Sequence, residues 1–149
     1  MPSDLEAYVR SDAFNIINVN VGKSNWLKKR SIKDFKILLT HESLHSASRK
    51  FSAIVDNNLN ENYCSTYIGD TINKSIILNE GFAEYFTEKL MGKPCNGDDK
   101  YYSYYLNFAK AIVADIGEYS VQKAFFTGDN ASIAKVKKSL EKFIKTYVP

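Results

Sequence analysis

The sequence contains an H-E-x-x-H motif formed by His41, Glu42 and His45. The two histidines are four residues apart, so on a helix both imidazole rings lie on one face, one turn apart. This spacing allows two ring nitrogens to hold one zinc ion, with Glu42 placed to take a proton from a water activated at that ion. The chain has no other histidine. The motif therefore predicts a zinc centre with Glu42 as general base.

The residues before the motif have the pattern of a helix. Ser31 and Asp34 are close to a capping box, and apolar residues then recur at helical intervals up to His41. We therefore expect residues 31–50 to form one helix that carries the motif. The alternative is a solvated helix whose polar face happens to carry these side chains, because short motifs also occur by accident.

The motif leaves the zinc site one protein ligand short. A catalytic zinc ion takes three protein ligands and keeps a fourth position for water. Both histidines of the chain are already used, so the third ligand must be an acid or, less usually with this motif, a cysteine. The most suitable acids lie in residues 78–85. The alternative interpretation of the glutamates there is again a solvated helix face.

Residues 79–85 read N-E-G-F-A-E-Y and lie downstream of the H-E-x-x-H motif. Together the two motifs resemble the gluzincin zinc metallopeptidases, which include thermolysin, a class of aminopeptidases and the small single-domain minigluzincins. The resemblance implies that Glu80 is the third zinc ligand and that Glu84 orients the first histidine. These two glutamates are one helical turn apart, and a ligating histidine commonly donates its other N–H to a carboxylate. The resemblance covers about residues 31–91, with a longer spacing between the motifs than in thermolysin-like enzymes.

A second resemblance is to the repressor-cleaving ImmA/IrrE-type peptidases, in which a glutamate precedes an A-x-x-F-A-type run and a Leu-Met-Pro end. Glu80, Ala83, Phe86 and the segment 90–94 follow that pattern in part. The N-E-G triplet fits the gluzincin pattern better. Under either resemblance Glu80 is the zinc ligand.

The resemblance and the residue patterns predict an α+β fold, a predominantly helical zincin-like domain with a small antiparallel sheet or hairpin. Residues 14–21 are rich in β-branched residues, which indicates a strand, and residues 63–68 and 71–76 flank a Gly-Asp pair, which indicates a hairpin. Residues 1–13 are expected to form a polar lead or a first short helix. Further helices are expected over residues 78–91, from an Asp98–Asp99 cap to Ile116, over 119–126, and from an Asn130 cap onward.

The 149 residues show no linker or repeat, so we expect one metallopeptidase domain over residues 1–149. A net charge of +3 is too small to imply a nucleic-acid partner. No apolar run has the length of a membrane-spanning helix, and the acidic start shows no signal peptide. We therefore expect no membrane partner and a cytoplasmic protein, or a secreted one if a leader precedes this sequence. Cys64 and Cys95 permit a disulfide without arguing for one, and we expect a structural role.

The predicted activity is zinc-dependent hydrolysis of peptide bonds in a peptide or protein substrate, with one catalytic Zn²⁺ ion. The tetrahedral oxyanion needs a further hydrogen-bond donor. The resemblance implies a tyrosine, histidine or arginine outside the motif, and no spare histidine exists. Residues 101–105 contain four tyrosines, and Tyr67 lies in the predicted hairpin. We favour Tyr105 and then Tyr104.

Other hypotheses remain beside this one. A catalytically silent zinc-binding domain would keep the metal site, although a structural site has no use for a general base such as Glu42. Nucleic-acid binding through the lysines of the last helix is weak at this net charge. A terminal segment, 1–10 or 146–149, would inhibit the enzyme by lying in the cleft. An edge strand within residues 65–75 would bind an extended substrate by strand addition.

Overall fold

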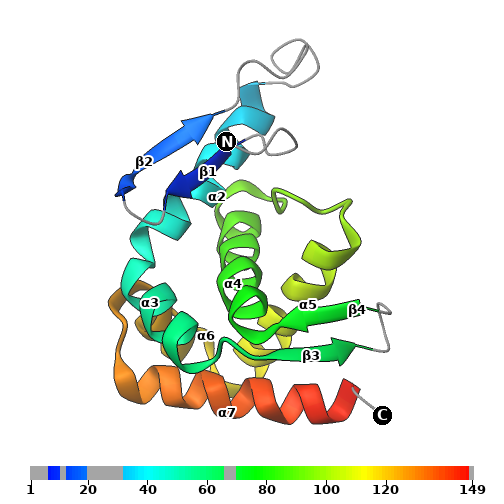
Figure 1. Cartoon of the computed structure of the whole chain (residues 1–149). Coiled ribbons are helices and arrows are strands. Elements are labelled where there is room, and N and C mark those ends of the chain that lie inside the picture. The colour runs from blue at the N-terminus through cyan, green and yellow to red at the C-terminus, as the bar shows by residue number, and fades with distance from the viewer. Residues whose placement is uncertain (1–6, 11–12, 20–31, 66–69, 148–149) are drawn as a thin grey trace.

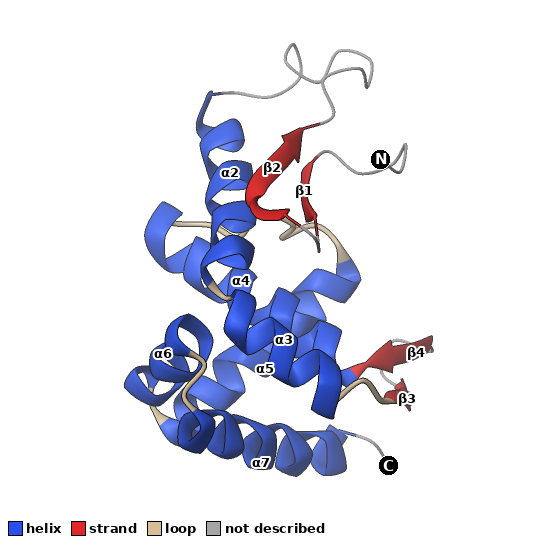
Figure 2. Ribbon diagram, turned by 60° about the vertical axis from the view of Figure 1, so that its left-hand side comes forward, coloured by secondary structure: helices blue, strands red, loops and turns tan. Residues whose placement is uncertain are grey.

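The computed structural model describes residues 7–10, 13–19, 32–65 and 70–147. This part of the chain is predominantly helical, as predicted, and carries two antiparallel strand pairs (Figures 1 and 2). The elements in chain order are β1 (Ala7–Arg10), β2 (Ala13–Val19), α2 (Ile32–Ala47), α3 (Arg49–Asn58), β3 (Asn62–Ser65), β4 (Asp70–Asn73), α4 (Lys74–Met91), α5 (Lys100–Ile116), α6 (Glu118–Thr127) and α7 (Asn130–Tyr147).

The two strand pairs lie at opposite ends of the molecule. β1 pairs with β2 and contacts α2, the helix that carries the H-E-x-x-H motif. β3 pairs with β4 near the last turns of α7 (Figures 1 and 2). β2 lies where a strand was predicted, but β1 replaces the polar lead or short helix expected there. That prediction failed because the pairing with β2 imposes a strand on a segment too short to show a clear period.

The helix predicted over residues 31–50 is two helices that meet at Ser48. Ser31, its predicted cap, lies outside the described residues. α3 continues to Asn58, through polar residues whose types favour a loop. Its helical form follows from Phe51, Val55 and Leu59, which are four residues apart and buried on one face against the core. Tertiary packing thus overrides the polar composition of the segment.

α4, the helix that carries Glu80, begins earlier than predicted. The side chain of Asn73 accepts hydrogen bonds from the backbone N–H groups of Ser75 and Ile76, so it caps the helix. Residues 74–76 are therefore helical rather than the end of a strand. Gly92 ends α4 in the left-handed conformation, at φ 83°, where the sequence placed the end.

Aspartates cap two of the later helices. Asp99 caps α5 by accepting from the N–H groups of Tyr101 and Tyr102, as predicted. The cap of α7 is Asp129, which accepts from the N–H and the hydroxyl of Ser132, rather than the predicted Asn130. Both residues favour this position, and the chain places the helix start one residue earlier than we predicted.

The core lies where α3, α4 and α6 meet. Phe51, Phe82 and Phe125 are fully buried, and their ring centroids lie 5.4–5.9 Å apart. α4 packs against α2 on one side and along α5 on another. This arrangement makes α4 the central helix and fixes the side chains that it turns toward α2. Among the described residues, no helix has the length and apolar character needed to cross a membrane.

Candidate metal centre

Three of the predicted residues meet between α2 and α4. His41 and His45 come from α2, with their Nε2 atoms 3.1 Å apart. Oε2 of Glu80, from α4, lies 3.2 Å from each of these two nitrogen atoms. The helical spacing of the two histidines and the packing of the two helices therefore produce a triangle of three donor atoms.

The shape of this triangle fits a zinc ion. Tetrahedral ligands at about 2.0–2.1 Å from zinc lie roughly 3.3 Å from one another. The triangle also has no good protonation state of its own. If both Nε2 atoms carry protons to donate to Glu80, two N–H groups face each other across 3.1 Å. A cation that accepts a lone pair from each of the three atoms removes that conflict.

The electrostatics of the site favour positive charge. Burial alone lowers the pKa of His41, but the carboxylates of Glu80 and Glu84 outweigh it and raise that pKa to about 10. Burial raises the pKa of Glu80, but its hydrogen bonds to His41 and His45 hold that pKa well below its usual range. The negative charge gathered around the histidines would therefore help to bind a divalent cation.

Glu84 holds the first histidine from behind. It is fully buried, and its Oε1 lies 2.8 Å from Nδ1 of His41. The same carboxylate accepts hydrogen bonds from the backbone N–H groups of Cys95, at 3.2 Å, and Asn96, at 3.0 Å. The loop between α4 and α5 therefore holds the carboxylate of Glu84, and this carboxylate in turn orients the ring of His41. Sequence reasoning missed this loop because backbone donors leave no residue-type signal.

A cysteine is the less usual alternative for the third ligand, and Cys95 is the cysteine that lies near His41. Its sulfur forms a possible ligand group with His41 and Glu84, on the Nδ1 side of the imidazole ring. The triangle of donor atoms lies on the Nε2 side and takes its third atom from Glu80. The described residues thus pair the two histidines with a carboxylate rather than with a thiolate.

Glu42 is buried beside this triangle. Only 7 % of its surface is exposed. Burial raises the pKa of Glu42, while the nearby His41 and His45 act in the opposite direction. A carboxylate whose pKa lies above its usual value is a better proton acceptor near neutral pH. The environment of Glu42 therefore suits a general base.

Among the described residues, Tyr102 has its ring against His41, whereas Tyr105 and Tyr104 were favoured. Tyr67, the candidate in the predicted hairpin, lies outside the described residues. The ring of Tyr102 lies edge-on to His41, with centroids 6.3 Å apart. Burial and the carboxylates of the site, Glu80 foremost, raise the pKa of Tyr102, so its hydroxyl stays protonated and able to donate. Tyr105 lies next to Tyr102, and Tyr104 is buried in the core against Phe108. Tyr104 points elsewhere because residues two apart lie on different sides of a helix.

Asn79, which precedes the predicted ligand Glu80, ties α4 to α3. Its Oδ1 accepts a hydrogen bond of 2.9 Å from the hydroxyl of Ser52. Its Nδ2 donates one of 3.1 Å to Oδ1 of Asp56. The first residue of the N-E-G triplet therefore anchors the turn that carries Glu80.

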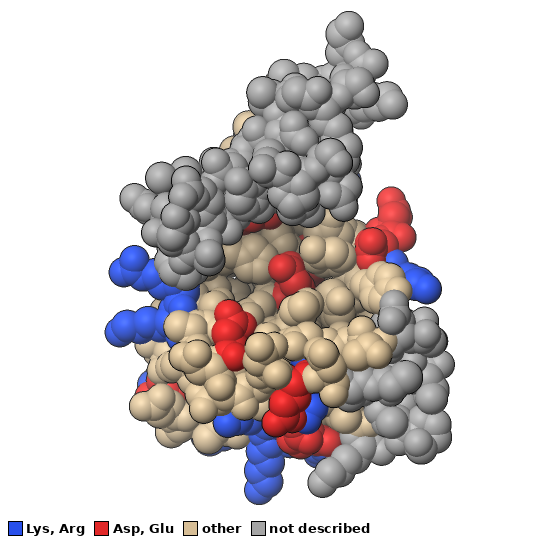
Figure 3. All heavy atoms as spheres, in the orientation of Figure 1, with Lys and Arg blue, Asp and Glu red and all other residues tan. Residues whose placement is uncertain are grey.

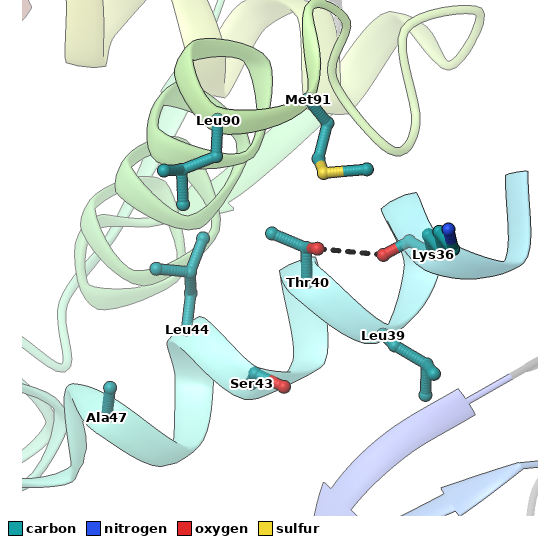
Figure 4. A pocket seen from close by; sticks show the side chains of 8 residues that line it. All are labelled: Lys36, Leu39, Thr40, Ser43, Leu44, Ala47, Leu90 and Met91. Atoms are coloured by element: carbon teal, nitrogen blue, oxygen red, sulfur yellow. Dashed lines mark hydrogen bonds between the residues drawn. The ribbon is translucent and has the colours of Figure 1, made fainter. Parts of the chain in front are cut away.

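A separate apolar groove of about 520 Å³ lies on another side of α2 (Figure 4). Leu44, Leu90 and Met91 are among the residues that line it. Lys36 is the one titratable side chain of that lining, and no donor atom of the histidine triangle takes part. The groove therefore offers none of the chemistry that the triangle offers.

Comparison of the chain with protein-family models, with curated proteins and with solved structures gives no match. The chemistry of the site is therefore argued from its own donor atoms. Two imidazoles and one carboxylate form the ligand set of one type of catalytic zinc centre, which keeps a fourth position open. The residues present fit such a centre in donor type, number and spacing.

Proposed function

We propose that the protein is a zinc-dependent peptidase of the gluzincin type, with His41, His45 and Glu80 as the metal ligands. The observation that carries this proposal is the triangle of two imidazole nitrogens and one carboxylate oxygen beside a buried glutamate. A structural zinc site closes its fourth position with a protein ligand and needs no base. A base next to a three-ligand site favours catalysis over a purely structural role.

When bound, the ion lowers the pKa of a water molecule and polarises the carbonyl of the scissile bond. Glu42 would take a proton from the attacking water as the water oxygen bonds to the carbonyl carbon, and would deliver that proton to the amine nitrogen as the C–N bond breaks. Its burial and raised pKa suit both steps, because the carboxyl must gain and lose one proton near neutral pH. Glu84 keeps the ring of His41 in one orientation through the cycle.

We assign the oxyanion donor to Tyr102 in place of Tyr105 and Tyr104. The position of its ring beside His41 and its protonated hydroxyl support this assignment. A preorganised donor aimed at the developing negative charge stabilises the transition state more than the substrate.

Replacement of Tyr102 by Phe is expected to lower kcat by roughly 10²-fold, the usual cost of removing one oxyanion donor, with KM little changed. Steady-state kinetics on a peptide substrate measure both values. Tyr104→Phe is the matched control, because it removes a hydroxyl from the same helix at a core position. A wild-type kcat in Tyr102→Phe, or a comparable loss of kcat in Tyr105→Phe, would contradict the assignment of the oxyanion donor to Tyr102.

The strand pair beside the motif helix offers a place for substrate. β1 and β2 form a two-stranded sheet among the described residues, and both strands contact α2. We therefore transfer the strand-addition hypothesis from the β3–β4 hairpin, which lies at the far end of the molecule (Figure 1), to the β1–β2 pair. Backbone hydrogen bonds along such an edge would hold an extended peptide with loose side-chain selectivity.

The charge on the described part of the face in Figure 3 suits a peptide better than a nucleic acid. Acidic side chains lie in the middle of the face in Figure 3, and both acidic and basic side chains lie toward its edges. On α7, Lys142 pairs with Asp115 at 2.9 Å. A phosphate backbone needs a continuous basic surface, which this face lacks among the described residues.

The proposed activity is tested by digestion of a mixed peptide library with the purified chain, followed by mass spectrometry. We expect new peptide termini in the presence of zinc and none after a chelator has removed the ion, because the ligands alone do not activate water. Addition of zinc to the chelated sample should restore cleavage. Cleavage that persists without metal would assign the activity to a contaminant or to other chemistry.

A further inference from the structure

Gly81 lies inside α4, directly after the proposed ligand Glu80. Glycine in the middle of a helix is destabilising relative to alanine. A Cβ atom at this position would lie 2.6 Å from the backbone oxygen of Tyr105 and 3.4 Å from Cβ of Ala109. The backbone of α5 therefore approaches α4 more closely here than any side chain would allow.

The close approach bears on the position of Tyr102. Tyr105, whose backbone oxygen faces Gly81, is three residues after Tyr102 in α5, and the two rings are in contact at 5.6 Å. A methyl group on Gly81 would have to push this oxygen away by several tenths of an ångström to reach ordinary contact distance. A helix backbone moves as a unit, so the ring beside His41 would move with it.

The displacement should fall on α5 rather than on α4. The preceding turn of α4 is held by Asn79, which bonds to Ser52 and Asp56 of α3. Glu84, one turn further, is held by the backbone of Cys95 and Asn96. α4 is thus held on both sides of Gly81, so Glu80 stays in place. The position of the Tyr102 ring, in contrast, depends on the spacing between α4 and α5.

We propose that Gly81 is a positioning residue that sets the distance between the helix carrying Glu80 and the helix carrying Tyr102. The part of this proposal that concerns catalysis rests on the proposed peptidase function. Gly81 would act through Tyr102 and would not touch the substrate. Its role explains why the triplet N-E-G has glycine at a helical position where alanine would otherwise stabilise the chain.

The kinetic test is Gly81→Ala in the zinc-loaded protein. We expect kcat to fall about 10–100-fold, the range that a misplacement of up to 1 Å can produce, with KM and zinc affinity close to wild type. A double-mutant cycle then separates positioning from general damage. In a Tyr102→Phe background, Gly81→Ala should cost little further activity, because the group it displaces is already gone. Equal losses in both backgrounds would overturn the proposal.

A second readout needs no activity. In protein labelled with ¹³C in the tyrosine rings, the signals of Tyr102 are identified by their loss in Tyr102→Phe. We expect Gly81→Ala to shift these signals while those of Tyr104 stay in place. Unchanged Tyr102 signals would overturn the proposal. If the wild-type chain is inactive but Gly81→Ala still shifts the Tyr102 signals, the peptidase function is refuted and the positioning role of Gly81 stands.

Ala109→Ser covers the case in which Gly81→Ala does not fold. It adds one atom to a buried residue of α5 that faces Gly81, and so widens the same helix pair. We expect the same shift of the Tyr102 signals and the same direction of change in kcat. Ala124→Ser is the matched control, because it adds the same atom at a buried position of α6, a helix without site residues. An effect of Ala124→Ser as large as that of Ala109→Ser would contradict the proposal.

Discussion

Glu42→Gln is expected to lower kcat for peptide cleavage by about 10²–10⁴-fold and to leave the bound zinc in place. Glutamine keeps the shape of the side chain but cannot accept the proton of the attacking water. Neither Nε2 atom of the histidines and no atom of Glu80 is removed, so the triangle of ligands persists. Cleavage of a peptide substrate and metal content, measured on the same sample, give the two values.

The matched control is Glu88→Gln, the same chemical change one turn beyond Glu84 on α4. Glu88 pairs with Lys110 at 2.8 Å and belongs to neither possible ligand group of the described residues. We expect wild-type activity and metal content from it. Full cleavage by Glu42→Gln would show that another group takes the proton, and loss of zinc from that variant would place Glu42 among the ligands.

Glu80→Ala is expected to remove zinc binding and, with it, all cleavage. The carboxylate is the one anionic donor of the triangle and the group that offsets the charge of the ion between the two histidines. Two neutral imidazoles on one helix form an incomplete site. We expect the loss of affinity to exceed the roughly 10–100-fold that removal of an outer partner costs. Titration of metal-free protein with zinc measures it.

Glu84→Gln belongs in the same titration, because its effect should lie between the extremes. Its carboxylate touches Nδ1 of His41 rather than the ion, so we expect zinc affinity to fall by about 10–100-fold with binding retained. The order of affinities should then be wild type, Glu84→Gln and Glu80→Ala. A variant of Glu84 that loses more zinc than Glu80→Ala would indicate that the metal lies on the Nδ1 side, near Cys95.

The three donor atoms could be predicted from the sequence because helix geometry fixes two of them. His41 and His45 lie on one face by their spacing alone. Glu80 and Glu84 came from a resemblance, and the structure places one on each side of the ring of His41. The burial of Glu42 could not be predicted from its own residue type. It results from the packing of α2 against other elements, chiefly α4.

The choice among the tyrosines could not be predicted for a related reason. Tyr102, Tyr104 and Tyr105 share one helix, and the face that turns toward the metal centre depends on how α5 packs against α4. The backbone oxygen of Tyr105 lies close to Gly81, and we propose that this contact sets the packing. A glycine within a helical pattern does not by itself indicate which helix packs against it.

The errors in the predicted fold also occur where contacts with distant segments decide the structure. Helix ends with a glycine or an aspartate cap, such as Gly92 and Asp99, were predicted correctly because local chemistry decides them. The break at Ser48 and the strand β1 depend on contacts with distant segments. The sequence pattern favours a continuous helix through Ser48, and it shows no strand at β1.

The most direct test of the proposed zinc peptidase activity is the reactivation of metal-free protein by measured amounts of zinc, with cleavage of a peptide substrate as the readout. We expect activity to rise linearly and to level off at about one ion per chain, as a single three-ligand site requires. We expect no activity from Glu42→Gln at any zinc concentration. Binding of one ion with no cleavage of any peptide would contradict the proposed activity. No binding at all would contradict the metal centre itself.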